Sequence, residues 1–270
     1  MAQYPLKRKH VVITGASDGI GRALALEVAG RGARVTLSAR SRDKLAAATD
    51  AITTGGGVAV AIPADVSSEG ECRVLMEQAI AAQGPIDVLV CNAGIGSAIQ
   101  GDDPIPIETI RRTMDVNFMG AVHATAAALP SLQETRGLIV AVSSLQGLLG
   151  FPKSCAYAAS KHAMQGFFDS LRIDLAGAVG VLVVSPGPVA TNIHRLDPTP
   201  GKKVSDEVLA RQAMPVADCA RLIRRAIEAR RRDLVMTSAG RLAVRLYPFF
   251  PGFVDTQVLK ANRRFYGGGR

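Results

Sequence analysis

The sequence predicts an α/β fold with a doubly wound parallel sheet and helices on both of its faces. Short β-branched runs alternate with helical segments from residue 10 onward, a glycine-rich turn joins the first run to the first helix, and small or polar residues follow several later runs. Alternation at this spacing is typical of parallel strands joined by crossover helices. Such sheets bind ligands at the carboxyl ends of their strands, so we expect the site there.

Runs rich in Val and Ile indicate the strands, because β-branched side chains pack well in a buried sheet. The expected strands are residues 10–14, 34–38, 58–62, 86–90, 137–143, 179–184 and 233–237. The expected helices start after the first turn and continue to Gly30, then cover 43–53, 69–83, a region from 102 to 132 interrupted by two prolines, 156–175 and 215–230. On the helix at 156–175, a stripe of apolar side chains is expected to face the core: Ala159, Ala163, Phe167 and Leu171.

Length and composition favour one large domain with a terminal extension. The chain has 270 residues, of which 48% are hydrophobic and 20% charged, an ordinary globular balance. We expect a cofactor-binding domain over 1–238, with a mobile substrate cover at about 192–214, and a C-terminal extension over 239–270. Four scattered cysteines without metal-ligand spacing predict buried free thiols in a reducing compartment and no metal site. The apolar run after the N-terminus is short for a signal peptide, and no run approaches a membrane span, so a soluble cytoplasmic protein is expected.

The net charge of +9 is unevenly distributed along the chain. Through residue 220 there are 20 Lys and Arg against 20 Asp and Glu, and from Arg221 onward there are 12 against 3. A nucleic-acid-binding domain would be basic throughout, and no nucleic-acid-binding module is recognisable. We therefore expect no nucleic-acid partner, but a neutral domain with a basic end.

The glycine-rich turn after the first strand predicts a phosphate site. Its glycines have the spacing Gly-x-x-x-Gly-x-Gly and lead directly into an alanine-rich helix. Glycines let the backbone amides approach a pyrophosphate at the positive end of that helix. The residues expected to bind a dinucleotide here are Gly15, Ser17, Asp18, Gly19, Ile20 and Gly21.

The end of the second strand favours the phosphorylated dinucleotide NADP(H). An acidic residue at this position bonds the ribose 2′-hydroxyl of NAD, whereas a nearby arginine accommodates a 2′-phosphate. Here Ala39 stands where the acid would be, and Arg40 and Arg42 follow. Guanidinium groups suit bidentate phosphate contacts. The alternative is that both arginines only solvate the start of the next helix.

A tyrosine and a lysine four residues apart are the candidate catalytic pair. On a helix, Tyr157 and Lys161 lie one turn apart on the same face. A phenol has an ordinary pKa near ~10, and a neighbouring ammonium lowers it, as general acid–base catalysis near neutral pH requires. Ser144 follows a predicted strand and could bond the oxygen of a reacting carbonyl. Taken alone, the spacing is more often that of an ordinary solvated helix face, and only the remainder of the chain favours the catalytic interpretation.

Taken together, these motifs resemble the short-chain dehydrogenases/reductases, from about residue 9 to 191 and more loosely to 237. The resemblance rests on an ordered series: Thr14-Gly15-x-x-x-Gly19-x-Gly21, Asp65-Val66, Asn92-Ala93-Gly94, Asn117, Ser144, Tyr157-x-x-x-Lys161 and Pro186-Gly187. Cys91 departs from the family's usual asparagine. The resemblance implies a Rossmann-like fold, hydride transfer between NADP(H) and a carbonyl or alcohol, and a homodimer or homotetramer formed through the helices that bear Asn117 and Tyr157.

The resemblance also implies a role for each matched residue. Tyr157 exchanges a proton with the substrate oxygen, Lys161 lowers the pKa of Tyr157 and bonds the nicotinamide ribose, Ser144 polarises the carbonyl, and Asn117 holds a water that relays protons. Further cofactor contacts are expected from the ends of later strands: Asp65, Val66, Asn92, Ala93, Gly94, Pro186, Gly187, Val189 and Thr191.

The substrate is expected to be small and apolar, because Leu148, Leu149 and Phe151 follow Ser144. A lipid-like or steroid-like carbonyl would suit such a wall. The alternatives are that these side chains belong to the core, that the substrate is another carbonyl such as a 3-oxoacyl thioester, or that the protein is a catalytically silent dinucleotide-binding regulator or scaffold.

The extension over 239–270 holds six of the twelve aromatic residues, interleaved with Arg and Lys. It could lie on an anionic membrane surface, or pack over the substrate cleft or against a partner subunit.

Overall fold

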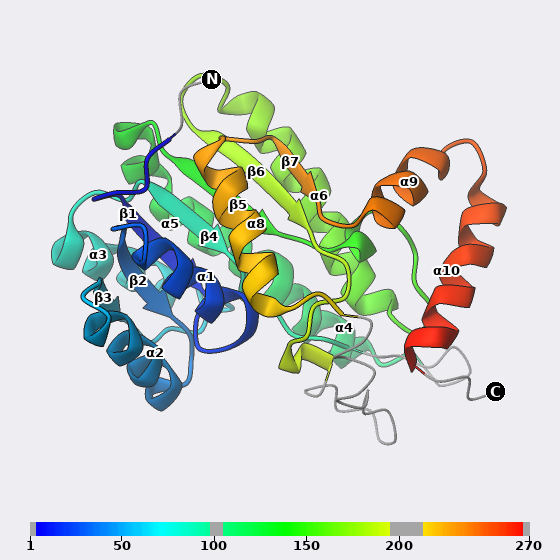
Figure 1. Cartoon of the computed structure of the whole chain (residues 1–270), viewed down its shortest axis with the longest axis horizontal. Helices are drawn as coiled ribbons and strands as arrows, with labels where there is room; N and C mark the ends of the chain where they lie inside the picture. The colour runs from blue at the N-terminus through cyan, green and yellow to red at the C-terminus, as the bar shows by residue number, and fades with distance from the viewer. Residues whose placement is uncertain (1–3, 98–104, 195–212, 267–270) are drawn as a thin grey trace.

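Seven parallel strands form one sheet in the order β3-β2-β1-β4-β5-β6-β7 in a computed structural model that describes residues 4–97, 105–194 and 213–266. The doubly wound prediction is confirmed, since the order reverses between β1 and β4. The strands, all visible in Figure 1, are β1 His10–Thr14, β2 Arg34–Ser38, β3 Val58–Ala61, β4 Val88–Cys91, β5 Leu138–Val142, β6 Gly180–Ser185 and β7 Asp233–Val235.

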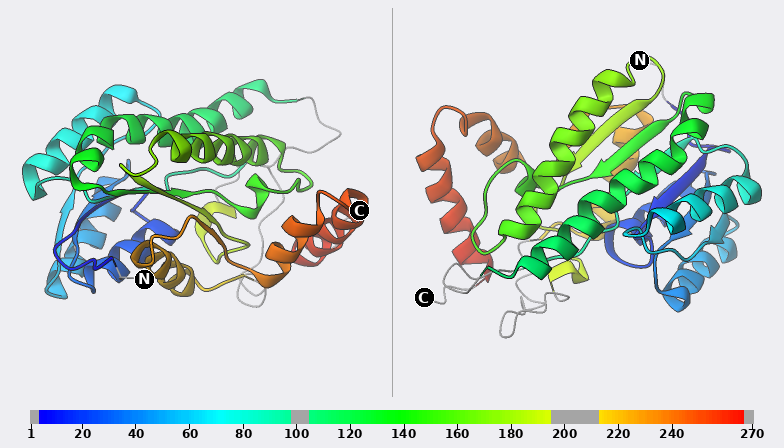
Figure 2. Two further views of the ribbon diagram at one scale, coloured as in Figure 1. Left: turned by 90° about the horizontal axis from the view of Figure 1, so that it is seen from above. Right: turned by 180° about the vertical axis from the view of Figure 1, so that it is seen from behind.

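Helices cover both faces of the sheet, as the edge-on view in Figure 2 shows. One face carries α1 (Gly19–Ala29), α2 (Arg42–Thr54) and α8 (Val216–Glu228), and the other carries α3 (Glu69–Gln83), α5 (Gly120–Thr135) and α6 (Cys155–Asp174). The side chains of β1, β4 and β5 are buried on both faces, which explains why these strands are continuous apolar runs.

The predicted stripe on α6 is confirmed only in part, because Phe167 and Leu171 pack against the core whereas Ala159 does not. Ala159 is exposed, and Ala163, Phe167 and Leu171 are only half-buried. The face turned inward instead contains Ala156, Ser160, Lys161, Met164 and Phe168. Ser160 and Lys161 are polar but buried, because they form hydrogen bonds with Asn117 and with the Val142 carbonyl. Hydrophobic periodicity therefore could not identify this face as the buried one.

The region predicted as one interrupted helix is two helices with an irregular turn between them. Helix α4 covers Ile107–Met114, and α5 follows after a π-helical turn at Asp115–Met119. A π turn contains one residue more than an α turn and often occurs at functional sites. This turn includes Asn117, whose side chain is completely buried.

The end of the chain forms a pair of helices that stands beside the sheet (Figures 1 and 2). Helix α9 covers Ser238–Leu246 and α10 covers Pro251–Tyr266. We call this pair with its connecting residues 247–250 the C-terminal hairpin. It packs on the segment after β5 through a small apolar cluster centred on Leu149, Val254 and Val258. Within the described ranges, no helix is long and apolar enough to cross a membrane.

Candidate active site

The glycine-rich turn after β1 has space for main chain only. Gly15 and Gly19 have φ angles of +66° and +53°, in the left-handed region that favours glycine. A Cβ on Gly21 would lie 2.4 Å from the carbonyl oxygen of Gly15, so α1 can start this close to the turn only without a side chain there. The turn therefore presents backbone amides at the positive end of α1, as a phosphate site requires.

Asp18 begins α1 and is connected to a distant segment. Its side chain accepts a hydrogen bond from the Gly19 amide (2.7 Å) and another from Asn192 Nδ2 (2.8 Å). Partial burial alone would raise the pKa of Asp18, but the bonds from Asn192 and Gly19, with Lys44 nearby, hold it below its usual value. The carboxylate is therefore ionised at neutral pH and fixes residue 192 against the turn.

The residues after β4 clamp the same turn from the other side. Asn92 Nδ2 donates to the carbonyl oxygens of Thr14 (3.0 Å) and Gly15 (3.1 Å). The Thr14 hydroxyl accepts from the amides of Asn92 and Ala93. A Cβ on Gly15 would lie 2.7 Å from Ala93 Cα, so these two segments are in direct contact. The two ends meet where the strand order reverses, which is where doubly wound sheets bind their ligands.

The ends of β2 and β3 bring Arg40 and Asp65 together. Their side chains form an ion pair of 3.7 Å, and the Arg40 side chain is 60% exposed. Partial burial would raise the pKa of Asp65, but hydrogen bonds from Ser67 and the charge of Arg40 lower it. Arg42 is the first residue of α2, which agrees with the alternative that this arginine only solvates the start of the helix. Arg40 lies before the helix. Val66 is buried against Gly120 and serves packing.

The segment after β6 approaches both the glycine-rich turn and the residues after β5. The Pro186 carbonyl accepts from the Leu145 amide (2.9 Å), and a Cβ on Gly187 would lie 2.9 Å from Thr237 Cγ2. Val189 is buried and pairs with Met214. A Cβ on Gly19 would lie 3.2 Å from Thr191 Cγ2, so Thr191 lies over the start of α1. Most of the predicted cover at 192–214 lies outside the described residues.

Tyr157 and Lys161 face each other on α6. The Lys161 ammonium lies 5.7 Å from the centre of the Tyr157 ring, as the four-residue spacing predicts. Lys161 is buried, and its Nζ donates to the carbonyl oxygen of Val142 at 2.9 Å. Burial disfavours the charged form and lowers the pKa of Lys161 from 10.5 to about 8. The lysine is therefore a cation at neutral pH, but its pKa lies close to neutral pH.

Asn117 holds the main chain after β4 next to Lys161. Its Oδ1 accepts from the Ile95 amide (2.7 Å), and its Nδ2 donates to the Ile95 carbonyl and to Ser160 Oγ, both at 3.0 Å. A Cβ on Gly94 would lie 3.2 Å from Asn117 Oδ1 and 3.8 Å from Lys161 Nζ. Since both amide protons are used, a water held by this residue would have to meet its oxygen or its main chain.

Ser144 stands where β5 ends. Its backbone is extended, and its Oγ accepts from the Gln146 amide at 3.1 Å, which starts a 3₁₀ turn at Leu145–Gly147. The preceding Ser143 donates to the Lys161 carbonyl at 3.2 Å. A Cβ on Gly147 would lie 2.7 Å from that same carbonyl, so the turn after Ser144 packs directly on α6. This contact fixes the end of β5 against the helix that carries Tyr157.

Residues 9–199 match the family model described as short chain dehydrogenase. The chain belongs to this family. It is 37% identical over 224 residues to an Arabidopsis thaliana protein named 11-beta-hydroxysteroid dehydrogenase-like 3. The matched region covers 82% of this chain and 70% of the Arabidopsis protein. It is thus an oxidoreductase of the short-chain dehydrogenase type.

Two solved structures resemble this short-chain dehydrogenase over most of its length. A short chain dehydrogenase/reductase from Burkholderia phymatum, in complex with NAD, aligns with a TM-score of 0.84 and 28% identity, covering 93% of this chain and 96% of that one. An alcohol dehydrogenase from Thermococcus sibiricus, complexed with 5-hydroxy-NADP, aligns with a TM-score of 0.76 and 25% identity, covering 86% and 97%. The two structures hold different dinucleotides, so they favour neither for this chain.

The apolar segment after Ser144 packs against the C-terminal hairpin in this short-chain dehydrogenase. Leu149 is buried in the cluster that it forms with Val254 and Val258, which supports the alternative that it is a core residue. Leu148 and Phe151 are half-buried beside it. The C-terminal hairpin therefore packs directly on the segment that follows Ser144.

Three of the four cysteines are buried free thiols as predicted, but Cys155 is exposed. Cys155 is the first residue of α6, where the chain enters the helix from the surface. Burial raises the pKa of Cys91 to about 12, so this thiol stays protonated at neutral pH. Among the described residues, no group of three His, Cys, Asp or Glu side chains could hold a metal ion.

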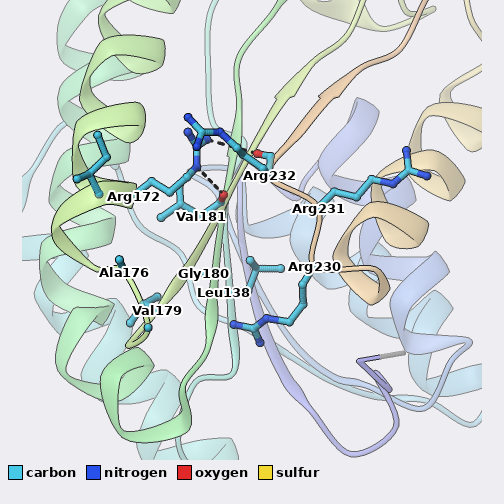
Figure 3. Close-up of a pocket in the computed structure, with 11 residues that line it drawn as sticks. Leu138, Arg172, Ala176, Val179, Gly180, Val181, Arg230, Arg231 and Arg232 are labelled. Carbon is cyan, nitrogen blue, oxygen red and sulfur yellow. Dashed lines mark hydrogen bonds between the residues drawn. The ribbon is translucent and has the colours of Figure 1, made fainter. Parts of the chain in front are cut away.

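A hollow of about 470 Å³ lies at the opposite edge of the sheet, at the amino ends of β5 and β6 (Figure 3). Arginines line it, but they are engaged within the fold. Arg172 forms ion pairs with Asp169 and Asp233, and Arg230 donates to the Gly137 carbonyl at 2.7 Å. These contacts hold the amino end of β6 to its neighbours.

Two residues of the site were missed at the sequence level. Asn192 bonds Asp18 from 174 positions away, and Ser160 supports Asn117 through a bond across two elements. Asn192 follows Thr191 and Ser160 precedes Lys161, so each lies next to a residue that the motifs identified. Their positions in the sequence give no indication of these contacts.

Proposed function

We propose that this protein is an NADP(H)-dependent oxidoreductase that interconverts a carbonyl and a secondary alcohol, with Tyr157 as the general acid and base. The observation that carries the proposal is the buried Lys161 ammonium, held by the Val142 carbonyl and facing the Tyr157 ring. Burying an ammonium opposes folding, and groups with such strongly perturbed pKa values gather at functional sites. Here the charge favours the phenolate form of the tyrosine and so lowers its pKa.

The residues at the strand ends fit a dinucleotide. The crowded glycines leave room for main chain but not for side chains, as close approach to a pyrophosphate requires. When bound there, the cofactor supplies or accepts the hydride. Gly15, Ser17, Gly19, Ile20 and Gly21 would hold its phosphates. The residues that follow the later strands would hold its remaining parts: Asp65, Val66, Asn92, Ala93, Gly94, Pro186, Gly187, Val189 and Thr191.

The protein's own groups would handle the proton. In the reducing direction, the Tyr157 hydroxyl gives its proton to the substrate oxygen as negative charge develops there, and the Ser144 hydroxyl donates a hydrogen bond to the same oxygen. Lys161 stabilises the resulting phenolate. Asn117 keeps Ile95 and Ser160 in place and so fixes the surroundings of the lysine.

Replacing the tyrosine tests this mechanism. Tyr157→Phe should bind NADPH as the native protein does and lose at least 100-fold in the rate of carbonyl reduction. Tyr4→Phe, a change to a tyrosine packed beside Arg230 at the other edge of the sheet, is the matched control and should keep full activity. Full activity of Tyr157→Phe would refute the mechanism. NADPH binding without turnover of any carbonyl or alcohol by the native protein would favour the regulator or scaffold.

The preference for NADP(H) rests on Arg40 and on the missing acid at the end of β2. Arg40 is exposed at the carboxyl edge, where a 2′-phosphate could displace its 3.7 Å contact with Asp65. We expect Ala39→Asp to shift the ratio of kcat/KM for NADPH over NADH by at least tenfold toward NADH. Equal use of both cofactors by the native protein would contradict the assignment.

An apolar ketone is the proposed substrate class, and the name of the Arabidopsis relative is in keeping with a steroid-like one. A panel of steroid, long-chain and small polar ketones, together with 3-oxoacyl thioesters, tests this. A clear preference for polar ketones would exclude the proposal.

We also propose a homodimer or homotetramer through α5 and α6, which sedimentation would measure.

A further inference from the structure

The C-terminal hairpin has both buried and exposed apolar side chains. On its inner side, Val254 and Val258 pack against Leu149 and leave 2% and 8% of their surfaces exposed. At and just after the connection between the helices, three phenylalanines are exposed: Phe249 (76%), Phe250 (58%) and Phe253 (58%). We call these three residues the aromatic patch.

The exposure of the aromatic patch is unusual within this protein. The other phenylalanines whose side chains the structure describes are buried or half-buried: Phe118, Phe151, Phe167 and Phe168. Leu242 and Leu259 of the same hairpin are also exposed. A soluble protein rarely gathers exposed aromatic rings on one element unless that surface meets a partner or a membrane.

The charge of the hairpin indicates which partner. Arg245, Lys260 and Arg263 are exposed, and none forms an ion pair with a carboxylate in the part of the chain that the structure describes. Arg241 donates to the Val235 carbonyl and the Ser238 hydroxyl, and among the described residues it forms no ion pair. The sole carboxylate between residues 238 and 266 is Asp255. Elsewhere on the surface several arginines are neutralised by neighbouring acids, for example Arg221 and Arg232.

Exposed aromatic rings flanked by uncompensated cations suit an anionic lipid surface. Phenyl rings insert at the boundary between headgroups and acyl chains, while Arg and Lys stay among the anionic headgroups. A second copy of the same hairpin fits less well, because a symmetric contact would bring like charges together. The hairpin also stands beside the sheet (Figures 1 and 2), so a membrane could reach its exposed side chains.

We propose that the C-terminal hairpin docks the protein on anionic membranes by inserting Phe249, Phe250 and Phe253 into the lipid interface, with Arg245, Lys260 and Arg263 on the headgroups. The proposed contact is peripheral, because the hairpin would lie on the membrane surface without crossing the bilayer. This proposal is independent of the chemistry at Tyr157, so either can fail without the other.

Vesicle flotation of the full-length protein tests the proposal. The native protein should float with phosphatidylcholine vesicles that contain phosphatidylserine, and less with pure phosphatidylcholine or at high salt. The variant F249S/F250S/F253S should bind at least tenfold more weakly. The variant R245E/K260E/R263E should lose on the order of 100-fold, because each cation near an anionic surface contributes about fivefold.

Matched controls change similar side chains elsewhere. Ile173→Ser removes an exposed apolar residue of α6, and R31E/R73E reverses two exposed arginines, one in the turn after α1 and one on α3. Both should bind vesicles as the native protein does, and the thermal midpoint of every variant should change little because the substituted residues are exposed. The proposal is overturned if the native protein does not float, if the phenylalanine variant floats equally well, or if that variant instead dissociates an oligomer in sedimentation.

Discussion

Replacing Lys161 by methionine should stabilise the fold while it removes activity. Burial lowers the pKa of Lys161 from 10.5 to about 8, which means that holding the charged ammonium in place costs about 3 kcal/mol below pH 8. Methionine fills a similar space without charge but leaves the Val142 carbonyl without its donor, at a cost of about 1 kcal/mol. The free energy of unfolding at pH 7 should therefore rise by about 2 kcal/mol.

The effect of pH has a definite sign. Between pH 8 and 10.5 the unfolded chain keeps the proton of Lys161 while the folded protein has released it. Native stability therefore rises with pH across this window, relative to the variant. The advantage of Lys161→Met should fall from about 2 kcal/mol at pH 7 to near zero at about pH 9.5.

Urea denaturation of both proteins at several pH values measures this difference, and the thermal midpoint at pH 7 should rise by roughly 4–8 °C. Lys260→Met, at an exposed position of α10, is the control and should change stability by less than about 0.5 kcal/mol. A less stable Lys161→Met at pH 7, or a difference that does not depend on pH, would refute the reasoning.

Three further substitutions test the contacts around the site. Gly21→Ala places a Cβ 2.4 Å from a carbonyl oxygen of the glycine-rich turn, so dinucleotide affinity in calorimetry should fall at least tenfold, whereas Gly166→Ala, in open space on α6, should leave it unchanged. Asn117→Ala leaves the amide and carbonyl of Ile95 without partners and should destabilise the protein by about 2 kcal/mol in urea; a loss as small as that of Asn262→Ala would contradict this. Asn192→Ala should raise the pKa of Asp18 in a carbon-13 NMR titration, and an unchanged pKa would show that the bond is absent in solution.

Local patterns predicted the elements well where one residue type decides the structure. The bounds of β1 and β2 and of α3 follow from β-branched runs and from the Ser68 cap and Gly84 stop. The glycine-rich turn was predictable from its glycine spacing. The structure shows why glycine is needed there, since a Cβ on Gly15 or Gly21 would collide with backbone atoms.

Long-range contacts could not be predicted in the same way. Which face of α6 is buried depends on Val142 and Asn117, which lie 19 and 44 residues before Lys161 and provide partners for polar side chains. The π turn at Asp115–Met119 has no residue signature, because its extra residue is accommodated by tertiary packing. The packing of the C-terminal hairpin on Leu149 likewise depends on a contact across about 100 residues.

The π turn before α5 makes the number of residues in this part of the chain matter as much as their identity. Each helical residue advances the backbone by about 100° and 1.5 Å. Deleting one residue between Asp115 and Met119 would restore regular α-helix and so remove the widened turn that contains Asn117. Asn117 could then no longer reach Ile95 and Ser160 together. The position of the Asn117 side chain therefore depends on the residue count of this turn as well as on the asparagine itself.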